Sequence, residues 1–311
     1  NFPVCEHLSC LNYISVEEVY QHVQNILSGS PNPINNEKEE PQANPLPVFG
    51  PPLKFYRGAH HRNNVFYSLD NFQLEHFDNL ATASQYWPVY DESLRHIKQG
   101  ATVLDWGCGD GHFSYFLLNN GFKTHSFNAN EGDAYNPEGC KLESFLGSEF
   151  QDAFQYKIST QGPVHLPYED ETFDAVVSVG VLEHVRQEGG SEAESMKEIH
   201  RVLKKGGLFL CYHFPNKYSW IEALARRSPS RHQHPYLFTK KDIYNLNKMA
   251  HLQVEKLQGY ALLPRNELSR LPKSIKNNLI FVCLYNLADL FLYSLFPLFF
   301  QNYYFLSRKS K

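Results

Sequence analysis

Short apolar runs and amphipathic stretches alternate through the middle of the chain. Residues 102–104 and 173–179 are nearly continuous apolar runs rich in β-branched residues, which is typical of parallel strands buried on both faces. Residues 191–203 instead carry apolar side chains at helical spacing, and a glycine pair follows at positions 206 and 207. This alternation predicts an α/β fold with helices on both faces of a mostly parallel sheet.

The other stretches of this region have helical spacing, strand-like apolar or alternating runs, or no regular period. Helical spacing predicts helices over 72–80, 90–97 and 239–250, the last of them capped by Thr239. Apolar or alternating runs predict strands over 122–128, 208–214 and 252–257. No period is found over 131–159 and 215–238, so both are expected to be irregular.

The first 53 residues have a different composition. Residues 15–27 have a serine N-cap, early glutamates and apolar positions at helical spacing, which predicts one amphipathic helix. Residues 29–53 are rich in proline and polar residues, and such a segment buries too little apolar surface to order itself. We therefore expect a short helical extension that is joined to the main domain by a linker.

A glycine-rich segment follows the first predicted strand. Asp105 begins the pattern D-x-G-x-G-x-G, with glycines at positions 107, 109 and 111, and a predicted helix over 112–120 comes next. Alternating glycines allow the backbone to turn tightly and to approach a ligand closely. Strand, glycine loop, helix and strand form the first half of a nucleotide-binding sheet, but the dinucleotide pattern requires a third glycine where this chain has His112.

Three ordered motifs carry a family resemblance. They are the glycine loop, LPYEDETFDAVVSVGVLEHV at 166–185 and EIHRVLKKGGLFL at 198–210. Together they resemble the class I S-adenosylmethionine-dependent methyltransferases, and in particular the small-molecule enzymes of the ubiquinone and menaquinone biosynthesis type. The resemblance implies a Rossmann-like sheet of seven mostly parallel strands, closed by a final strand over NYYFLS at 302–307.

The chain is expected to divide into six segments on this basis. These are an N-terminal helical segment (1–28), a proline-rich linker (29–53), an N-terminal helical cap (54–99), the methyltransferase core (100–260), an apolar helical insertion (261–301) and a closing strand with a tail (302–311).

The resemblance also implies a site for S-adenosylmethionine. The loop glycines would bring backbone against its methionyl part, and Asp105 would attract its ammonium group. Asn128 stands where the family has an acidic residue that binds the ribose, and Gly162 stands where an acidic residue often binds the adenine. The expected cofactor-binding residues are Asp105, Gly107, Cys108, Gly109, Gly111, Asn128, Ala129 and Val179.

The candidates for acceptor chemistry are histidines. His184 follows the predicted fourth strand beside Glu183, and a histidine is the natural base for an acceptor hydroxyl near neutral pH, although a packing role is an equal alternative. His213, which is the other predicted catalytic residue, is a second-choice base, as are His232 and His234. Quinone-ring O-methyltransferases place a metal-binding acid three residues before this glutamate. Gly180 occupies that position here, so no metal ion is expected.

Composition bounds the partners and the location. The chain has 29 Lys and Arg against 33 Asp and Glu, and this balance predicts no nucleic-acid partner. Six scattered cysteines predict a reduced, cytoplasmic protein, and Cys5, His7 and Cys10 lack a fourth ligand for a zinc site. The expected acceptor is a hydroxyl on an apolar or lipid-linked small molecule. The alternatives are N- or C-methylation of another metabolite, and a degenerate methyltransferase fold that serves as a scaffold.

The strongly apolar segment 278–300 precedes the closing strand. It is long enough to cross a bilayer, but both of its ends would have to return to one sheet, which disfavours a single span. Asn286 and Asp289 share one helical face and predict a narrow wet stripe. A cap over the acceptor pocket and a peripheral contact with a membrane surface both remain open. Lys273, Lys276, Arg308 and Lys309 flank the segment.

Overall fold

The computed structural model describes residues 65–66, 68–69, 72, 74, 77–129, 137–159, 161–162, 164–227 and 233–311, without the side chains of 137–141. All of them belong to one compact unit. The predicted helix 15–27, the linker 29–53, the Cys5–His7–Cys10 group and His232 lie outside the described residues. The predictions made for these residues stay predictions.

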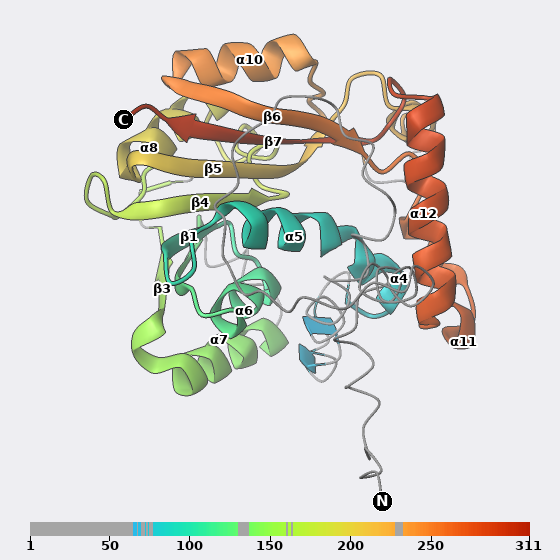
Figure 1. The fold of residues 1–311 in the computed structure, drawn as a ribbon, viewed down its shortest axis with the longest axis horizontal. Helices are drawn as coiled ribbons and strands as arrows, with labels where there is room; N and C mark the ends of the chain where they lie inside the picture. The colour runs from blue at the N-terminus through green and yellow to red at the C-terminus, as the bar shows by residue number, and fades with distance from the viewer. Residues whose placement is uncertain are drawn as a thin grey trace, which may run out of the picture. The chain divides into compact units, whose positions relative to one another are not determined.

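Seven strands form one mostly parallel sheet, as predicted, in the order β3-β2-β1-β4-β5-β7-β6 (Figure 1). Only β7 among them runs antiparallel to its neighbours, and it lies between β5 and β6. The predicted closing strand is therefore confirmed. The strands are β1 (Thr102–Trp106), β2 (Lys123–Asn128), β3 (Phe154–Ile158), β4 (Phe173–Val179), β5 (Leu203–Pro215), β6 (Leu252–Tyr260) and β7 (Asn302–Lys309).

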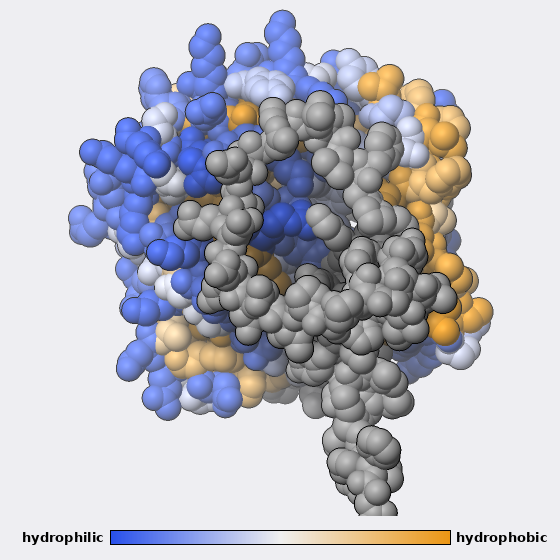
Figure 2. Space-filling view, viewed as in Figure 1, coloured by the Kyte–Doolittle hydropathy of each residue, from blue (hydrophilic) through white to orange (hydrophobic). Residues whose placement is uncertain are grey.

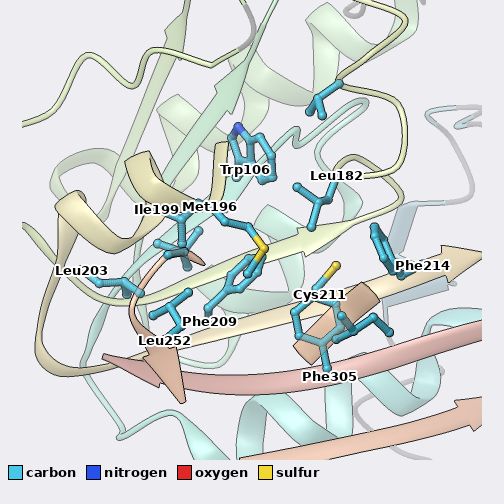
Figure 3. Close-up of a cluster of buried hydrophobic side chains, with 14 of the residues drawn as sticks. Trp106, Leu182, Met196, Ile199, Leu203, Phe209, Cys211, Phe214, Leu252 and Phe305 are labelled. Atoms are coloured by element: carbon cyan, nitrogen blue, oxygen red, sulfur yellow. The ribbon is translucent and has the colours of Figure 1, made fainter. Parts of the chain in front are cut away.

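The two faces of β5 pack against different helices, because successive side chains in a strand point in opposite directions. Phe209 and Cys211 join a core cluster with Met196 and Ile199 from α8 (Glu192–Val202) (Figure 3). Tyr212 points the other way, and its hydroxyl donates to Pro88 O in α5 (Trp87–His96) at 3.1 Å. Helices thus cover both faces of the sheet, as the pattern predicted.

The helices begin where the sequence indicates. Ser191 caps α8, and Thr239 forms a capping box with Asp242 at the start of α10 (Lys240–Met249). In each case the N-cap side chain accepts a hydrogen bond from an amide that the helix leaves unpaired. This explains why the predicted limits of both helices agree with the structure to within one residue.

Two regions predicted to be irregular contain regular structure. Residues 131–159 include α7 (Pro137–Phe150), the 3₁₀ turn η5 (Gln151–Ala153) and β3. Every residue of β3 is at least partly exposed, since the strand lies at the edge of the sheet, so it lacks the apolar run that marks a buried strand. Residues 215–238 include α9 (Trp220–Ala225).

The helix predicted over 72–80 is wrong in its described part, which is almost entirely non-helical up to Leu80. Leu74 and Phe77 are buried there without forming part of a regular helix. From Leu80 onwards the cap consists of α4 (Leu80–Ala83), the 3₁₀ turn η3 (Ser84–Tyr86) and α5. The apolar residues before Leu80 are therefore spaced as in a helix but are buried by tertiary packing in non-helical backbone.

The apolar segment forms α12 (Leu279–Leu295), which follows the short helix α11 (Lys273–Lys276) and crosses the direction of the strands at one end of the sheet (Figure 1). Its polar stripe faces inward, so the prediction of a wet stripe is wrong. Arg265 Nη2 donates to Asn286 Oδ1 at 2.8 Å and lies 3.3 Å from Asp289 Oδ2. Both residues are buried because Arg265 satisfies them inside the domain.

The outward face of α12 is apolar. Ile280 is 71% exposed and Phe291 is 63% exposed, and hydrophobic residues gather along this edge of the molecule (Figure 2). The exposed patch, called here the α12 patch, consists of Leu279, Ile280, Leu284, Leu290, Phe291, Leu295, Phe296, Leu298 and Phe299. No helix in the described part of the chain is long and apolar enough to cross a membrane.

Candidate cofactor and acceptor site

The glycine loop begins at the carboxyl end of β1, where it is bound to the neighbouring strand. The amides of Gly107 and Cys108 both donate to Phe127 O, at 2.8 and 3.1 Å. Gly107 has φ +73°, and a Cβ placed on it would lie 2.3 Å from the side chain of Val181. Only glycine fits this position, because the turn after β4 packs directly against the loop.

Gly109 is different, since a Cβ placed there would meet nothing within 4 Å. Its φ of +50° nevertheless requires a left-handed backbone, which glycine adopts without strain. Together these facts describe a backbone surface that is open above the loop, at the carboxyl end of the central strands. Such a surface suits a nucleotide ligand, and the loop therefore fits S-adenosylmethionine.

Asn128 holds the loop from the end of β2. Its Oδ1 accepts a hydrogen bond from Gly109 N at 3.0 Å, and its Nδ2 is 3.3 Å from the hydroxyl of Tyr156. The sequence suggested that Asn128 binds the ribose. In the structure its amide is used to fix Gly109, and ribose binding by this residue remains a prediction.

Asp105 is buried beneath the loop and is bound to α6 (His112–Asn119). Its Oδ2 accepts from Ser114 Oγ at 2.5 Å, and Ser114 Oγ lies 2.6 Å from Ser126 Oγ in β2. Burial raises the pKa of Asp105 to about 7, against the smaller opposing effect of the Ser114 hydrogen bond. A bound ammonium group would favour the charged carboxylate, which is the role expected for Asp105.

Replacing Asp105 with asparagine should change how stability depends on pH. The folded pKa of about 7 lies above the unfolded value, so the folded protein retains the proton more strongly. As pH rises from about 4 towards 7, the carboxyl should lose stabilisation that Asp105→Asn cannot lose. Urea unfolding at pH 5.5 and at pH 8 should therefore show that the free energy of unfolding falls more between these two pH values in the unmodified protein than in Asp105→Asn. Equal falls would contradict the assignment.

The other predicted cofactor residues lie at the same strand ends. Cys108 is buried in the loop, and its Sγ is 3.5 Å from Asn128 Oδ1. Burial raises the pKa of this thiol well above its usual value, which indicates a packing thiol rather than a nucleophile. Ala129 comes directly after β2, Val179 is the last residue of β4, and both are partly exposed. Their contact with a cofactor remains a prediction.

Glu183 and His184 lie in the turn after β4, next to Val181. The Glu183 carboxyl is buried, and burial raises its pKa to about 8. Its Oε1 lies 4.0 Å from His184 Nε2, and the His184 ring lies 5.6 Å from the ring of His234. His234 Nδ1 is in turn 2.9 Å from Glu222 Oε1 in α9.

His213 lies in β5 with different neighbours. Its Nδ1 and its backbone N–H are 2.9 and 2.8 Å from the hydroxyl of Tyr260, and its φ is +63°. Tyr86 packs edge-on to the His213 ring at 5.6 Å and lies 4.2 Å from the ring of His112, which opens α6. The structure thus gives the two predicted catalytic histidines different contacts: Glu183 and His234 lie near His184, whereas Tyr260 and Tyr86 lie near His213.

Sequence reasoning missed Glu222, Tyr260 and Tyr86. Only Glu222 carried a signal, since Ser219 and Glu222 have the spacing of a helix start, and Ser219 Oγ indeed accepts from Glu222 N. The pattern does not reveal that the Glu222 carboxylate binds a histidine in a later segment. Tyr260 and Tyr86 are aromatic residues among many, and nothing in their local sequence distinguishes them.

The glycine loop at the end of β1, in a seven-stranded sheet with an antiparallel β7, defines the class I S-adenosylmethionine-dependent methyltransferase fold. Residues 75–257 match the sequence model of a family described as a methyltransferase domain, and the chain belongs to this family. The predicted enzyme class and its cofactor, S-adenosylmethionine, are thereby confirmed at the level of the family.

The alignments with curated relatives cover only part of this chain and only part of each relative. A tRNA (carboxymethyluridine(34)-5-O)-methyltransferase of Arabidopsis thaliana is 29% identical over 140 residues, which are 43% of this chain and 29% of the relative. A tRNA U34 carboxymethyltransferase of Hydrogenovibrio crunogenus is 30% identical over 121 residues, 39% of this chain and 34% of the relative. The chain thus spans about a third of the length of these relatives.

The ubiquinone and menaquinone type is matched over a shorter stretch. The C-methyltransferase UbiE of Bartonella tribocorum is 38% identical over 64 residues, 19% of this chain and 22% of the relative. Among solved structures, the MccD protein has a TM-score of 0.50 and 15% identity, and the match covers 72% of this chain and 96% of that one. At this identity the likeness shows the fold alone.

The exclusion of a nucleic-acid partner was wrong. It rested on net charge, yet two of the curated relatives above are named for activity on tRNA. Net charge describes the whole chain and does not show how charge is distributed over one face, so a balanced total does not exclude nucleic acid.

Proposed function

We propose that this chain is an S-adenosylmethionine-dependent O-methyltransferase that acts at a membrane surface on an apolar or lipid-linked small molecule. The observation that supports this proposal is the inverted polarity of α12, whose polar residues face the domain while its apolar residues face outward. Burying a large apolar side chain is worth roughly 1.5–3 kcal/mol, so a patch of nine such residues favours an apolar partner.

The surroundings of the α12 patch favour lipid as that partner. Trp220 of α9 is exposed, and its backbone N–H donates to Phe299 O at 3.3 Å, so an interfacial aromatic residue adjoins the patch. Arg226 and Arg227 follow at the end of α9, and both are exposed. Apolar and aromatic residues with neighbouring cations are typical of a surface that lies in the headgroup region of an anionic membrane.

The α12 patch lies at the same edge of the sheet as His213, one of the two candidate bases. Residue Asn302 begins β7 three residues after the patch ends at Phe299, and it pairs with Pro215, the last residue of β5. Asn286 of α12 and Arg265 both bind Ser84 Oγ, at 3.2 and 3.0 Å, and η3 then places Tyr86 against His213. A lipid-linked acceptor held at this edge would have its reactive group near the site and its tail near the patch.

The reaction requires alignment and removal of one proton. When bound, S-adenosylmethionine supplies an activated methyl group and leaves as S-adenosylhomocysteine. The glycine loop, fixed by Asn128, would position it, and His184 or His213 would accept the proton of the acceptor hydroxyl. The hydroxyl oxygen of Tyr260 lies 2.9 Å from His213 Nδ1, and in the tautomer in which Nδ1–H donates to this oxygen, Nε2 is the nitrogen that can accept a proton.

Vesicle binding tests the proposed location. The full chain should float with vesicles that contain phosphatidylglycerol, and Leu284→Ser with Phe291→Ser should lower the bound fraction by roughly tenfold, because two exposed apolar anchors are lost. Tyr244→Ser with Met249→Ser is the matched control, since these residues of α10 are also exposed but lie outside the patch. No flotation of the unmodified chain, or an equal loss in the control, would contradict the proposal.

The second candidate is methylation of a tRNA, which the names of the curated relatives favour. Incubation of the chain with methyl-labelled S-adenosylmethionine, a total lipid extract and total tRNA discriminates the two. Label in the lipid fraction supports the first proposal. Label in tRNA alone would make the second candidate the function, and Gly109→Val in the same assay is the control for transfer that does not depend on the cofactor site.

A further inference from the structure

Three potential ligand side chains converge beside the glycine loop. In the described part of the chain, Glu183, His184 and His234 each offer one ligand atom, and these atoms lie within 4.8 Å of one another. Two come from the turn after β4, and the third comes from the segment between α9 and α10. Two distant parts of the chain therefore bring one carboxylate and two imidazoles together.

Glu183 is the unusual member of this group. Its side chain is only 1% exposed, and its Oε2 accepts or donates no hydrogen bond within the described residues. A buried carboxyl with an unpartnered oxygen is unfavourable, because it has lost water and gained nothing in return. A cation bound by the carboxylate would remove this cost.

His234 is oriented in the way that metal-binding histidines are. Its Nδ1 lies 2.9 Å from Glu222 Oε1, and Gln301 Nε2 donates to the same oxygen at 3.2 Å. Glu222 is nearly fully buried, so this orienting contact is fixed by packing. Histidine ligands commonly bond a carboxylate through one ring nitrogen and the metal through the other, and the contact between His234 Nδ1 and Glu222 matches the first of these two bonds.

We propose that Glu183, His184 and His234 bind one divalent transition-metal ion, with Glu222 as a positioning residue for His234. Two imidazoles and one carboxylate form a ligand set known for zinc and for iron(II), and this set leaves coordination positions for substrate. The prediction that no metal binds considered only Gly180. The third ligand proposed here comes from a different segment, which the sequence did not link to this turn.

The open positions indicate the acceptor class. This point, unlike the metal site itself, rests on the proposed function. We infer that the acceptor carries two adjacent oxygens, such as neighbouring hydroxyls, because such a pair can chelate the ion and its hydroxyls then become more acidic. His184 then serves as a ligand, and the proton of the reacting hydroxyl passes to His213, which lies outside the three-ligand group.

Cobalt binding tests the site without any acceptor. The full chain, freed of metal, is titrated with Co²⁺, and visible absorption reports coordination while Zn²⁺ should displace the signal. We expect one equivalent to bind. Glu183→Gln and His234→Gln should each weaken binding by about 100-fold or more, and Glu222→Gln by about 10–100-fold. His200→Gln is the matched control, since the His200 ring lies 6.2 Å from the His251 ring in a second histidine pair.

The outcomes separate this site from the proposed function. No stoichiometric Co²⁺ signal in the unmodified chain would overturn the metal site, as would unchanged binding in Glu183→Gln that still binds S-adenosylhomocysteine. A loss of signal in His200→Gln equal to that in His234→Gln would also overturn it. Failure of vesicle flotation would instead count against the membrane proposal and leave the metal site intact.

Discussion

Replacing Gly109 with valine is expected to abolish the binding of S-adenosylhomocysteine. A Cβ on Gly109 would point into open space above the loop, so the branched side chain would occupy the place proposed for the cofactor. The same residue donates its amide to Asn128 Oδ1 at 3.0 Å, and its φ of +50° disfavours a β-branched residue. Isothermal titration should show no heat from cofactor binding.

Gly100→Val is the matched control for Gly109→Val. Gly100 has φ +76°, and a Cβ placed on it would also meet nothing within 4 Å, but it lies before β1, at the opposite end of this strand from the loop. The control therefore imposes a similar backbone strain away from the site. Cofactor binding that survives in Gly109→Val, or that is lost equally in Gly100→Val, would show that the open loop surface is not the cofactor site.

Replacing Arg265 with leucine should lower the free energy of unfolding by about 3–5 kcal/mol, because it leaves a buried carboxylate without its cation. Arg265 and Asp289 are both about nine-tenths buried and lie 3.3 Å apart, and Arg265 also binds Asn286 and Ser84. Asp289 Oδ1 additionally accepts from Leu263 N at 2.6 Å, so the charge cannot turn to solvent easily. Urea unfolding measures the change.

The double variant Arg265→Leu with Asp289→Leu identifies the cause. Replacing both partners of a buried ion pair by apolar residues is often far less harmful than removing one, so the double variant should be more stable than Arg265→Leu alone. An exposed pair gives the comparison, since Arg270 is 76% exposed beside Glu267 and Arg270→Leu should change stability by less than about 1 kcal/mol. A double variant as unstable as Arg265→Leu would show that packing, rather than charge, dominates.

Much of the fold could be predicted because it depends on local patterns. Buried parallel strands such as β4 are apolar over most of their length, and α8 and α10 have side-chain caps next in sequence. The edge strand β3 was missed for the opposite reason, because partial exposure removes the apolar run. The prediction that the Asn286 and Asp289 face of α12 is wet was wrong because helical periodicity shows which residues share a face and does not show which face is buried.

The candidate site was less predictable. The glycine loop is contiguous in sequence, so its pattern was sufficient to locate it at the end of β1. His234, Glu222 and Tyr260 reach the acceptor side from separate segments, and their contacts exist only after the chain has folded. The use of Asn128 to fix Gly109 could not be inferred either, since an amide can serve a ligand or the backbone equally well.

The position of β7 has a consequence for the order of folding. Strands β1 to β4 pair with one another within residues 102–179, so this half of the sheet can assemble from contacts that are close in sequence. The other half cannot close until residues 302–309 have entered between β5 and β6, which are distant along the chain. Because such long loops close slowly, the glycine loop should form early, whereas the surface that carries α12 should be the last part to fold.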